Sequence, residues 1–166
     1  MTSEKTAADA QFLAPGEGRA IWFLRNRMTV KATAASTGGA YGLVESIIAP
    51  GFSPPLHVHH REDEAFYVLE GEVTMQCGDR TFTATAGAFV FLPRDVPHTF
   101  VVEGDRPARM LTLLSPGGGE GVFIDGGRVP EHEGMPPATP PDIPALKRVA
   151  EAYGSEIIGP PLAARR

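Results

Sequence analysis

Histidines and one carboxylate are the residues of this chain whose types and spacing most clearly suggest chemistry. His57 and His59 stand two positions apart in a segment with the composition of a β-strand, so both imidazoles point to the same face. Glu64 lies at the start of the next expected strand, and His98 opens a further one. If these groups converge inside a barrel, they form a site for a divalent transition metal such as Zn, Fe, Ni, Cu, Mn or Co.

The competing interpretation is a solvated strand face, because surface histidines are common. The neighbours along these strands are apolar, namely Leu56, Val58, Phe66, Val68 and Phe100. Four ionisable groups on such a face cost free energy unless they have a partner. The pattern therefore favours a metal site over a solvated face.

Five further polar or reactive residues are expected to lie outside this site. His60 points to the opposite strand face and is expected in solvent. The spacing of Glu62 and Asp63 does not match the ligand position, so a loop surface is expected for both. His132 stands between two glutamates in a segment rich in Gly and Pro and is expected to be solvated. Cys77, the single cysteine, is expected to be a buried, inert thiol.

Turn-forming residues dominate the composition, since the 166-residue chain has 19 glycines and 16 prolines. This content argues against a helical bundle, because both residue types are unfavourable inside a helix. Short apolar runs alternate with turn signals at spacings of about 8–12 residues, which is typical of an antiparallel sandwich or barrel. The expected strands cover residues 20–24, 29–34, 41–49, 56–60, 65–69, 73–77, 81–85, 89–92, 99–102 and 109–114.

The C-terminal part of the sequence has a different character. Residues 122–124 are expected to form one more strand, and the proline-rich residues 135–141 an extended linker. Asp142 is expected to cap a helix that runs to Tyr153 and stops at Gly154. We therefore divide the chain into a flexible N-terminal arm (1–17), a β-barrel domain (18–126), and a Pro/Gly-rich linker with a helix packed on the barrel (127–166).

Charge and hydropathy exclude two classes of partner. The net charge is −5 and the sequence has no basic run, so we expect no nucleic-acid partner. We see no signal peptide and no apolar stretch near the roughly 18 residues that a membrane span needs. Together with the single cysteine, these features lead us to expect a cytoplasmic protein without a membrane partner.

Two motifs give the chain a resemblance to the cupin superfamily, over roughly residues 20–115. Gly51-x5-His57-Val58-His59-x4-Glu64-x6-Gly71 matches the first cupin motif, and Gly87-x5-Pro93-x4-His98 matches the core of the second. Asp95 and Val102 stand where the second motif usually has a glycine and an asparagine. The resemblance implies an all-β cupin barrel (a double-stranded β-helix or jelly-roll), here with a short C-terminal α-helix. It also implies that His57, His59, Glu64 and His98 hold one divalent metal ion.

A narrower resemblance is to single-domain, quercetinase-like cupins. It rests on the segment Pro55–Gly71, on the upstream Ile21–Phe23 and on the terminal Tyr153-Gly154. It implies a metal-dependent dioxygenase that cleaves a flavonol-like or enolisable aromatic substrate with O2, in which Glu64 is both a metal ligand and the base. A non-oxidative cyclase or isomerase of a polyketide-type substrate, and a small-ligand-binding cupin without turnover, are the alternatives. The family analogy also implies a homodimer.

Apolar side chains on the motif strands are candidates for a substrate pocket. We expect the lining to come from Phe66, Met75, Phe91, Phe100 and Met110. Only alternate positions of a strand face inward, so about half of such candidates serve the core or the outer face instead. An aromatic cavity of this kind suits a hydrophobic aromatic or polyketide-like substrate.

Overall fold

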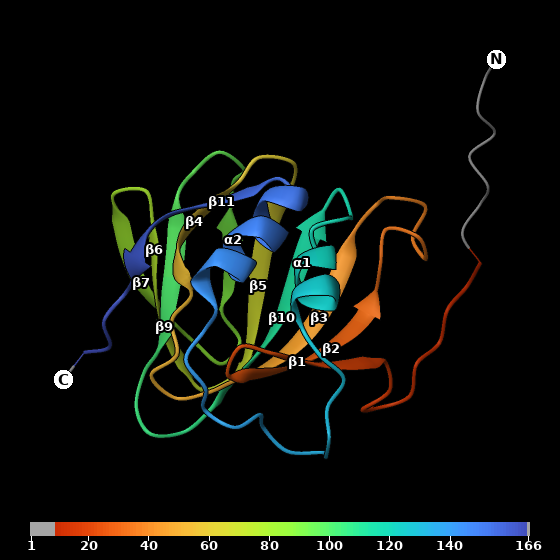
Figure 1. Cartoon of the computed structure of the whole chain (residues 1–166), viewed down its shortest axis with the longest axis horizontal. Helices are drawn as coiled ribbons and strands as arrows, with labels where there is room; N and C mark the ends of the chain where they lie inside the picture. The colour runs from red at the N-terminus through yellow and green to blue at the C-terminus, as the bar shows by residue number, and fades with distance from the viewer. Residues whose placement is uncertain (1–8, 166) are drawn as a thin grey trace.

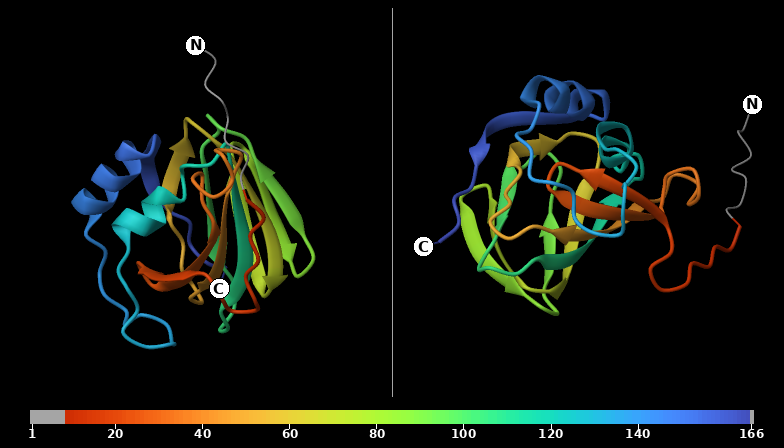
Figure 2. Two further views of the ribbon diagram at one scale, coloured as in Figure 1. Left: turned by 90° about the vertical axis from the view of Figure 1, so that its right-hand side faces the viewer. Right: turned by 60° about the horizontal axis from the view of Figure 1, so that its bottom comes forward.

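Two antiparallel β-sheets face each other and form a barrel with two helices along one side (Figures 1 and 2). The computed structural model describes residues 9–165. One sheet has the strand order β1-β2-β3-β10-β5-β8, and the other has the order β11-β4-β9-β6-β7. The strands are β1 (Arg19–Phe23), β2 (Asn26–Ala32), β3 (Gly42–Ile48), β4 (Pro55–His59), β5 (Asp63–Glu70), β6 (Glu72–Cys77), β7 (Arg80–Thr85), β8 (Phe89–Leu92), β9 (His98–Val102), β10 (Ala108–Ser115) and β11 (Ser155–Pro161).

The expectation of an all-β fold of the cupin type is confirmed, and each of the ten expected strands overlaps an observed one. Strand alternation is the physical reason, because it sorts side chains between the core and the outer face. In β8, for example, Val90 and Leu92 are buried whereas Phe89 and Phe91 are exposed. Gly71 makes the turn from β5 to β6 with φ of +88°, and a Cβ there would lie 2.9 Å from the Cα of Ala108. Only glycine combines that φ with that close approach.

Residues 122–124 are helical, so the expectation of a strand there is wrong. They belong to α1 (Gly121–Gly126), in which Phe123 packs edge-on against Phe23 of β1 with ring centroids 5.3 Å apart. A run of three apolar residues cannot by itself distinguish a strand from a helical turn. Tertiary packing against β1 decides the outcome here.

The C-terminal helix and the strand that follows it close one side of the barrel. Helix α2 (Ile143–Ala152) begins as expected, with the Asp142 carboxylate accepting a hydrogen bond from the backbone N–H of Ala145 at 2.9 Å. Gly154 has φ of +79° and ends the helix, as expected. Strand β11 then pairs with β4, so the C-terminal segment adds a strand to the sheet that carries His57, His59 and His98.

The expected N-terminal arm lies partly outside the described residues, which begin at residue 9. Residues 9–17 contain no strand or helix, and the carbonyl of Lys31 accepts a hydrogen bond from Gln11 at 3.2 Å. Neither α1 nor α2, the helices of residues 9–165, has the length and apolar character needed to cross a membrane.

Candidate metal centre and the cavity beside it

Three neighbouring strands bring three imidazoles and one carboxylate to a single point inside the barrel. His57 and His59 come from β4, His98 comes from β9, where it pairs with His57, and Glu64 comes from β5 in the facing sheet. One ligand atom from each of the four residues lies within 4.8 Å of the ligand atoms of the other three. The four side chains that the sequence singled out are therefore together.

The backbone fixes the tautomers of two of the histidines. The Nδ1 of His57 lies 2.8 Å from the carbonyl oxygen of Pro55, and the Nδ1 of His98 lies 3.0 Å from that of Val96. A carbonyl oxygen only accepts, so each Nδ1 must carry the hydrogen. In the neutral rings, the Nε2 atoms then present lone pairs, which is the form that binds a metal.

A buried carboxylate orients the third histidine in the same way. The Nδ1 of His59 lies 2.6 Å from Oε1 of Glu62 and 3.0 Å from the hydroxyl of Ser155 in β11. Its Nε2 is buried, lies 3.6 Å from Oε2 of Glu64, and has no hydrogen-bond partner within residues 9–165. An unsatisfied buried nitrogen aimed at three other ligand atoms is the signature expected of a residue that binds a metal.

The position of Glu62 corrects the expectation of a loop surface. The residue is only 2% exposed, and Gly119 lies against it so closely that a Cβ there would be 2.5 Å from its Oε1. Asp63, by contrast, points outward and pairs with the Arg94 guanidinium at 3.0 Å. The sequence carries no local signal for the burial of Glu62, because Ser155 and Gly119 come from distant parts of the chain.

The electrostatics of the cluster favour a positive charge at its centre. Burial, together with the charges of His98 and His59, lowers the pKa of His57 to about 4, so this ring is neutral at pH 7. Burial alone would raise the pKa of Glu64, but the His59 charge and the His98 hydrogen bond outweigh it and lower this pKa to about 2. Burial alone would lower the pKa of His59, but the charge of Glu64 and the hydrogen bond and charge of Glu62 outweigh burial and raise this pKa. The raised pKa of His59 and the lowered pKa of Glu64 both reflect attraction between a proton and the carboxylates, and a bound cation would take the place of that proton.

The donor set therefore fits a divalent transition metal. Three imidazole nitrogens and one carboxylate oxygen suit Zn, Fe, Ni, Cu, Mn and Co, and the set does not select among them. Glu62 completes a carboxylate–histidine arrangement of the kind that orients metal-binding imidazoles.

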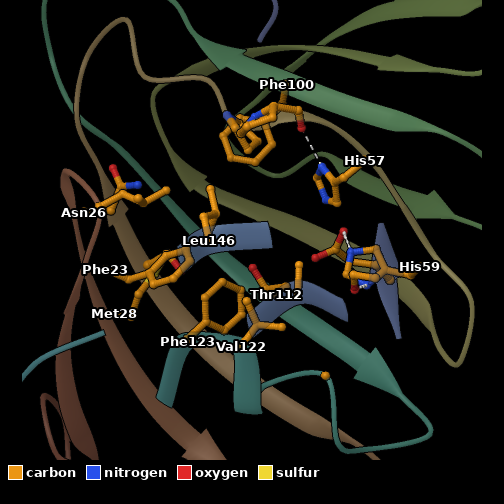
Figure 3. Close-up of a pocket in the computed structure, with 18 of the residues that line it drawn as sticks. Phe23, Asn26, Met28, His57, His59, Phe100, Thr112, Val122, Phe123 and Leu146 are labelled. Atoms are coloured by element: carbon orange, nitrogen blue, oxygen red, sulfur yellow. Dashed lines mark hydrogen bonds and ion pairs between the residues drawn. The ribbon is translucent and has the colours of Figure 1, made fainter. Parts of the chain in front are cut away.

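A cavity of about 110 Å³ adjoins the cluster, and its walls are mostly apolar (Figure 3). Of the five predicted lining residues, Phe66 and Phe100 face it. Met75 and Met110 do not, because they are fully buried in the core between the sheets. Phe91 does not either, because β8 turns it to the outer face, where it is 55% exposed.

Residues outside the motif strands complete this cavity. Phe23 of β1, Asn26 at the start of β2, Phe123 of α1 and Leu146 of α2 all line it. None of these four is among the five residues predicted for the lining. The apolar stripe of the C-terminal helix was the available signal for Leu146, but the surface it covers depends on the tertiary arrangement.

The two departures from the second cupin motif have local explanations. Asp95 adopts the left-handed conformation, with φ of +62°, that a glycine would otherwise supply. Aspartate tolerates this region better than most residues, and its carboxylate contacts Nδ1 of the exposed His60 at 2.7 Å. Val102 is fully buried and contributes to the core.

Comparison with known proteins agrees with these observations. Residues 44–114 match the family model described as a cupin domain. The chain is 27% identical over 140 residues to quercetin 2,3-dioxygenase of Bacillus subtilis, a match that covers 84% of this chain and 41% of that protein. It is 36% identical over 93 residues to the polyketide synthase CurC of Streptomyces cyaneus, with 56% and 58% covered.

Solved structures show the same fold. Oxalate decarboxylase of Bacillus subtilis, a protein with Mn(II) centres, aligns with a TM-score of 0.51 and 21% identity, over 57% of this chain and 26% of that one. The chain spans about two fifths of the dioxygenase and about three fifths of CurC. With its two motifs, its all-β fold and the domain match over residues 44–114, the chain is similar to proteins of the cupin superfamily.

Proposed function

We propose that this protein is a metal-dependent dioxygenase that cleaves a flavonol-like or enolisable aromatic substrate with O2. His57, His59, Glu64 and His98 hold the metal in this proposal. The observation that carries it is the convergence of these four side chains at the wall of an apolar, aromatic-lined cavity. The similarity to quercetin 2,3-dioxygenase over most of the chain supports the choice of substrate class.

The chain's own residues have distinct roles in this chemistry. A bound divalent metal supplies a Lewis acid that lowers the pKa of the substrate's enolic hydroxyl and favours its reaction with O2. The Glu64 carboxylate is ionised at neutral pH, and in this proposal it accepts the proton of the hydroxyl that the metal would make more acidic. Phe66 and Phe100 contact the ring system and keep water away from the reacting carbons.

The size of the cavity constrains the substrate. A cavity of about 150 Å³ holds one benzene molecule, so the 110 Å³ here does not hold a three-ring flavonol as it stands. Leu146 lines both this cavity and a second hollow of about 640 Å³, as do Phe52, Pro55 and Ile157. A flavonol therefore requires α2 to move outward and join the two hollows, whereas a smaller enolisable substrate requires a smaller movement.

A second candidate function is a non-oxidative cyclase or isomerase of a polyketide-type substrate. The similarity to CurC favours it, because that protein is named as a polyketide synthase component. The same metal and the same base, Glu64, serve this chemistry without O2. A cupin that binds a small ligand without turnover is the remaining alternative.

Elemental analysis followed by oxygen-uptake assays distinguishes these functions. We expect about one redox-active metal per chain and O2 uptake with flavonols in air but no product under argon. Turnover under argon supports the cyclase or isomerase, and binding without product supports the binding protein. Zinc as the only metal, with no oxygen uptake, overturns the dioxygenase proposal.

Two variants connect the assay to the cluster. His98→Ala removes one ligand and is expected to abolish metal retention and turnover together. His60→Ala is the matched control, because His60 is adjacent in sequence to His59 but exposed and outside the cluster. Retention of metal and ligand binding by His98→Ala contradicts the assignment of the site.

We also propose that the protein is a cytoplasmic homodimer. The outer face of β5, β8 and β10 exposes an apolar group of side chains that a second copy would cover, namely Tyr67, Phe89, Phe91 and Leu113. Light scattering on the purified protein tests the dimer, and Phe91→Asp is expected to shift it toward the monomer. Cell fractionation tests the location.

A further inference from the structure

Two buried side-chain nitrogens lack a hydrogen-bond partner within residues 9–165, and both belong to residues that line the same cavity. They are Nε2 of His59 and Nδ2 of Asn26. The first is explained by the metal proposed above. The second lies outside the metal cluster and needs an explanation of its own, because an unpaired buried donor is unfavourable.

The orientation of the Asn26 amide is determined by its other half. The residue is fully buried at the start of β2, and its Oδ1 accepts a hydrogen bond from the backbone N–H of Ala49 at 3.0 Å. A backbone N–H can only donate, so the oxygen must face Ala49 and the NH₂ group must face away from it. Asn26 lines the cavity, and its buried NH₂ group has no acceptor among residues 9–165.

Asn26 lies far from the metal cluster. Figure 3 shows it on the side of the cavity opposite His57 and His59, with Leu146, Phe123 and Thr112 between them. A ligand that fills the space between these two ends is flanked by largely apolar walls. It would meet the metal at one end and an amide donor at the other.

We propose that Asn26 is a substrate-specificity residue whose Nδ2 donates a hydrogen bond to an acceptor oxygen at the far end of the substrate. This inference rests on the proposed function and narrows it. The substrate class becomes molecules that carry a metal-binding enolic oxygen at one end and a carbonyl or hydroxyl oxygen at the other, and an elongated aromatic member of this class requires the outward movement of α2 described above. The simpler alternative is that Asn26 only ties the start of β2 to Ala49 through its Oδ1.

Matched ligand pairs separate these two roles. The probes are 3-hydroxyflavones that carry either a formyl group, which accepts a hydrogen bond, or a vinyl group of nearly the same shape, at position 4′ or at position 7. Binding to the zinc-loaded protein is measured anaerobically by fluorescence titration, so turnover is not the readout. We expect the wild-type protein to bind one formyl compound about tenfold more tightly than its vinyl partner.

Two variants complete the test. Asn26→Leu removes the donor and the link to Ala49, whereas Asn26→Asp keeps an acceptor for the Ala49 N–H but replaces the donor with an oxygen. We expect both variants to lose the tenfold preference while their zinc content stays unchanged. If Asn26→Leu fails to fold, Asn26→Asp decides the question.

The other outcomes have distinct meanings. Equal binding of formyl and vinyl compounds to the wild type, or a preference that survives in Asn26→Asp, overturns the role of Asn26 and leaves the proposed function intact. Failure of every probe to bind the zinc-loaded wild type overturns the flavonol-like substrate class together with this inference.

Discussion

Glu62 offers the sharpest test of how the proposed metal centre is built. Its carboxylate, 2% exposed, accepts a hydrogen bond from Nδ1 of His59 at 2.6 Å. Glu62→Gln keeps the length of the side chain and one neutral acceptor near that nitrogen but removes the negative charge. Glu62→Ala removes the acceptor altogether and leaves Ser155 as the remaining contact of Nδ1.

The expected magnitude follows from these contacts. Loss of an outer carboxylate that orients a metal-binding histidine typically costs 10–100-fold in metal affinity. Glu62→Gln retains a hydrogen bond and should lie near the tenfold end, which is about 1.4 kcal/mol. Glu62→Ala frees the imidazole to rotate and should lie near the hundredfold end, about 2.8 kcal/mol.

Competition with a chromogenic chelator measures this affinity for Zn²⁺ and Co²⁺ without any need for a substrate. The Co²⁺ absorption spectrum provides a second readout, because it reports the coordination geometry and should shift in Glu62→Ala. Glu120→Gln is the matched control. Glu120 is also a buried carboxylate, but it accepts hydrogen bonds from the backbone N–H groups of Ala34 and Gly118, both at 2.7 Å, and does not belong to the cluster.

Wild-type affinity in both Glu62 variants would refute the reasoning, because the carboxylate would then have no influence on His59 as a ligand. An equal loss in Glu120→Gln would also refute it, since the effect would then reflect general destabilisation. A loss that is larger in Glu62→Ala than in Glu62→Gln, with Glu120→Gln unchanged, supports the positioning role.

Three further predictions use other features of the structure. Gly119→Ala places a Cβ 2.5 Å from Oε1 of Glu62, so metal affinity should fall roughly tenfold by the same assay. Burial alone would raise the pKa of Glu45, but the hydrogen bond and charge of Arg109 outweigh burial and lower this pKa below its usual 4.5. The Glu45–Arg109 ion pair therefore stabilises the folded protein above about pH 4.5, and this stabilisation is lost as the pH falls through the lowered pKa. Glu45→Gln should therefore cost about 0.5–1 kcal/mol in urea unfolding at pH 7, and this cost should shrink as the pH falls below 4.5. His60→Ala should leave zinc affinity within twofold of wild type, because His60 lies in solvent and outside the cluster.

Local pattern explains why most strands and the four-residue cluster could be predicted. Alternation along a strand places His57 and His59 on one face without knowledge of the rest of the chain. Turn chemistry contributes as well, since Gly71 has the positive φ that its motif position requires. Turn chemistry also holds at Asp95, where the second motif usually has a glycine. Asp95 has φ of +62°, so the left-handed turn is retained without a glycine.

Features that depend on distant partners could not be predicted in this way. Glu62 looks like any loop carboxylate until β11 brings Ser155 to the same imidazole, from 96 positions beyond His59. Residues 122–124 are a helix because Phe123 packs on Phe23, about a hundred positions earlier. Alternation along a strand also does not decide which of its two faces points into the core. For that reason the outward position of Phe91 in β8 could not be predicted.

The metal cluster and the cavity walls come from different parts of the chain. The four cluster residues lie within 44–114, the range that matches the cupin domain. Much of the wall that a substrate would meet lies outside that range, in Phe23, Asn26, Phe123 and Leu146. Substitutions at Phe23, Asn26, Phe123 and Leu146 should therefore change substrate specificity without changing metal affinity, whereas metal affinity should follow substitutions at the cluster residues and at Glu62 and Gly119, which lie against them.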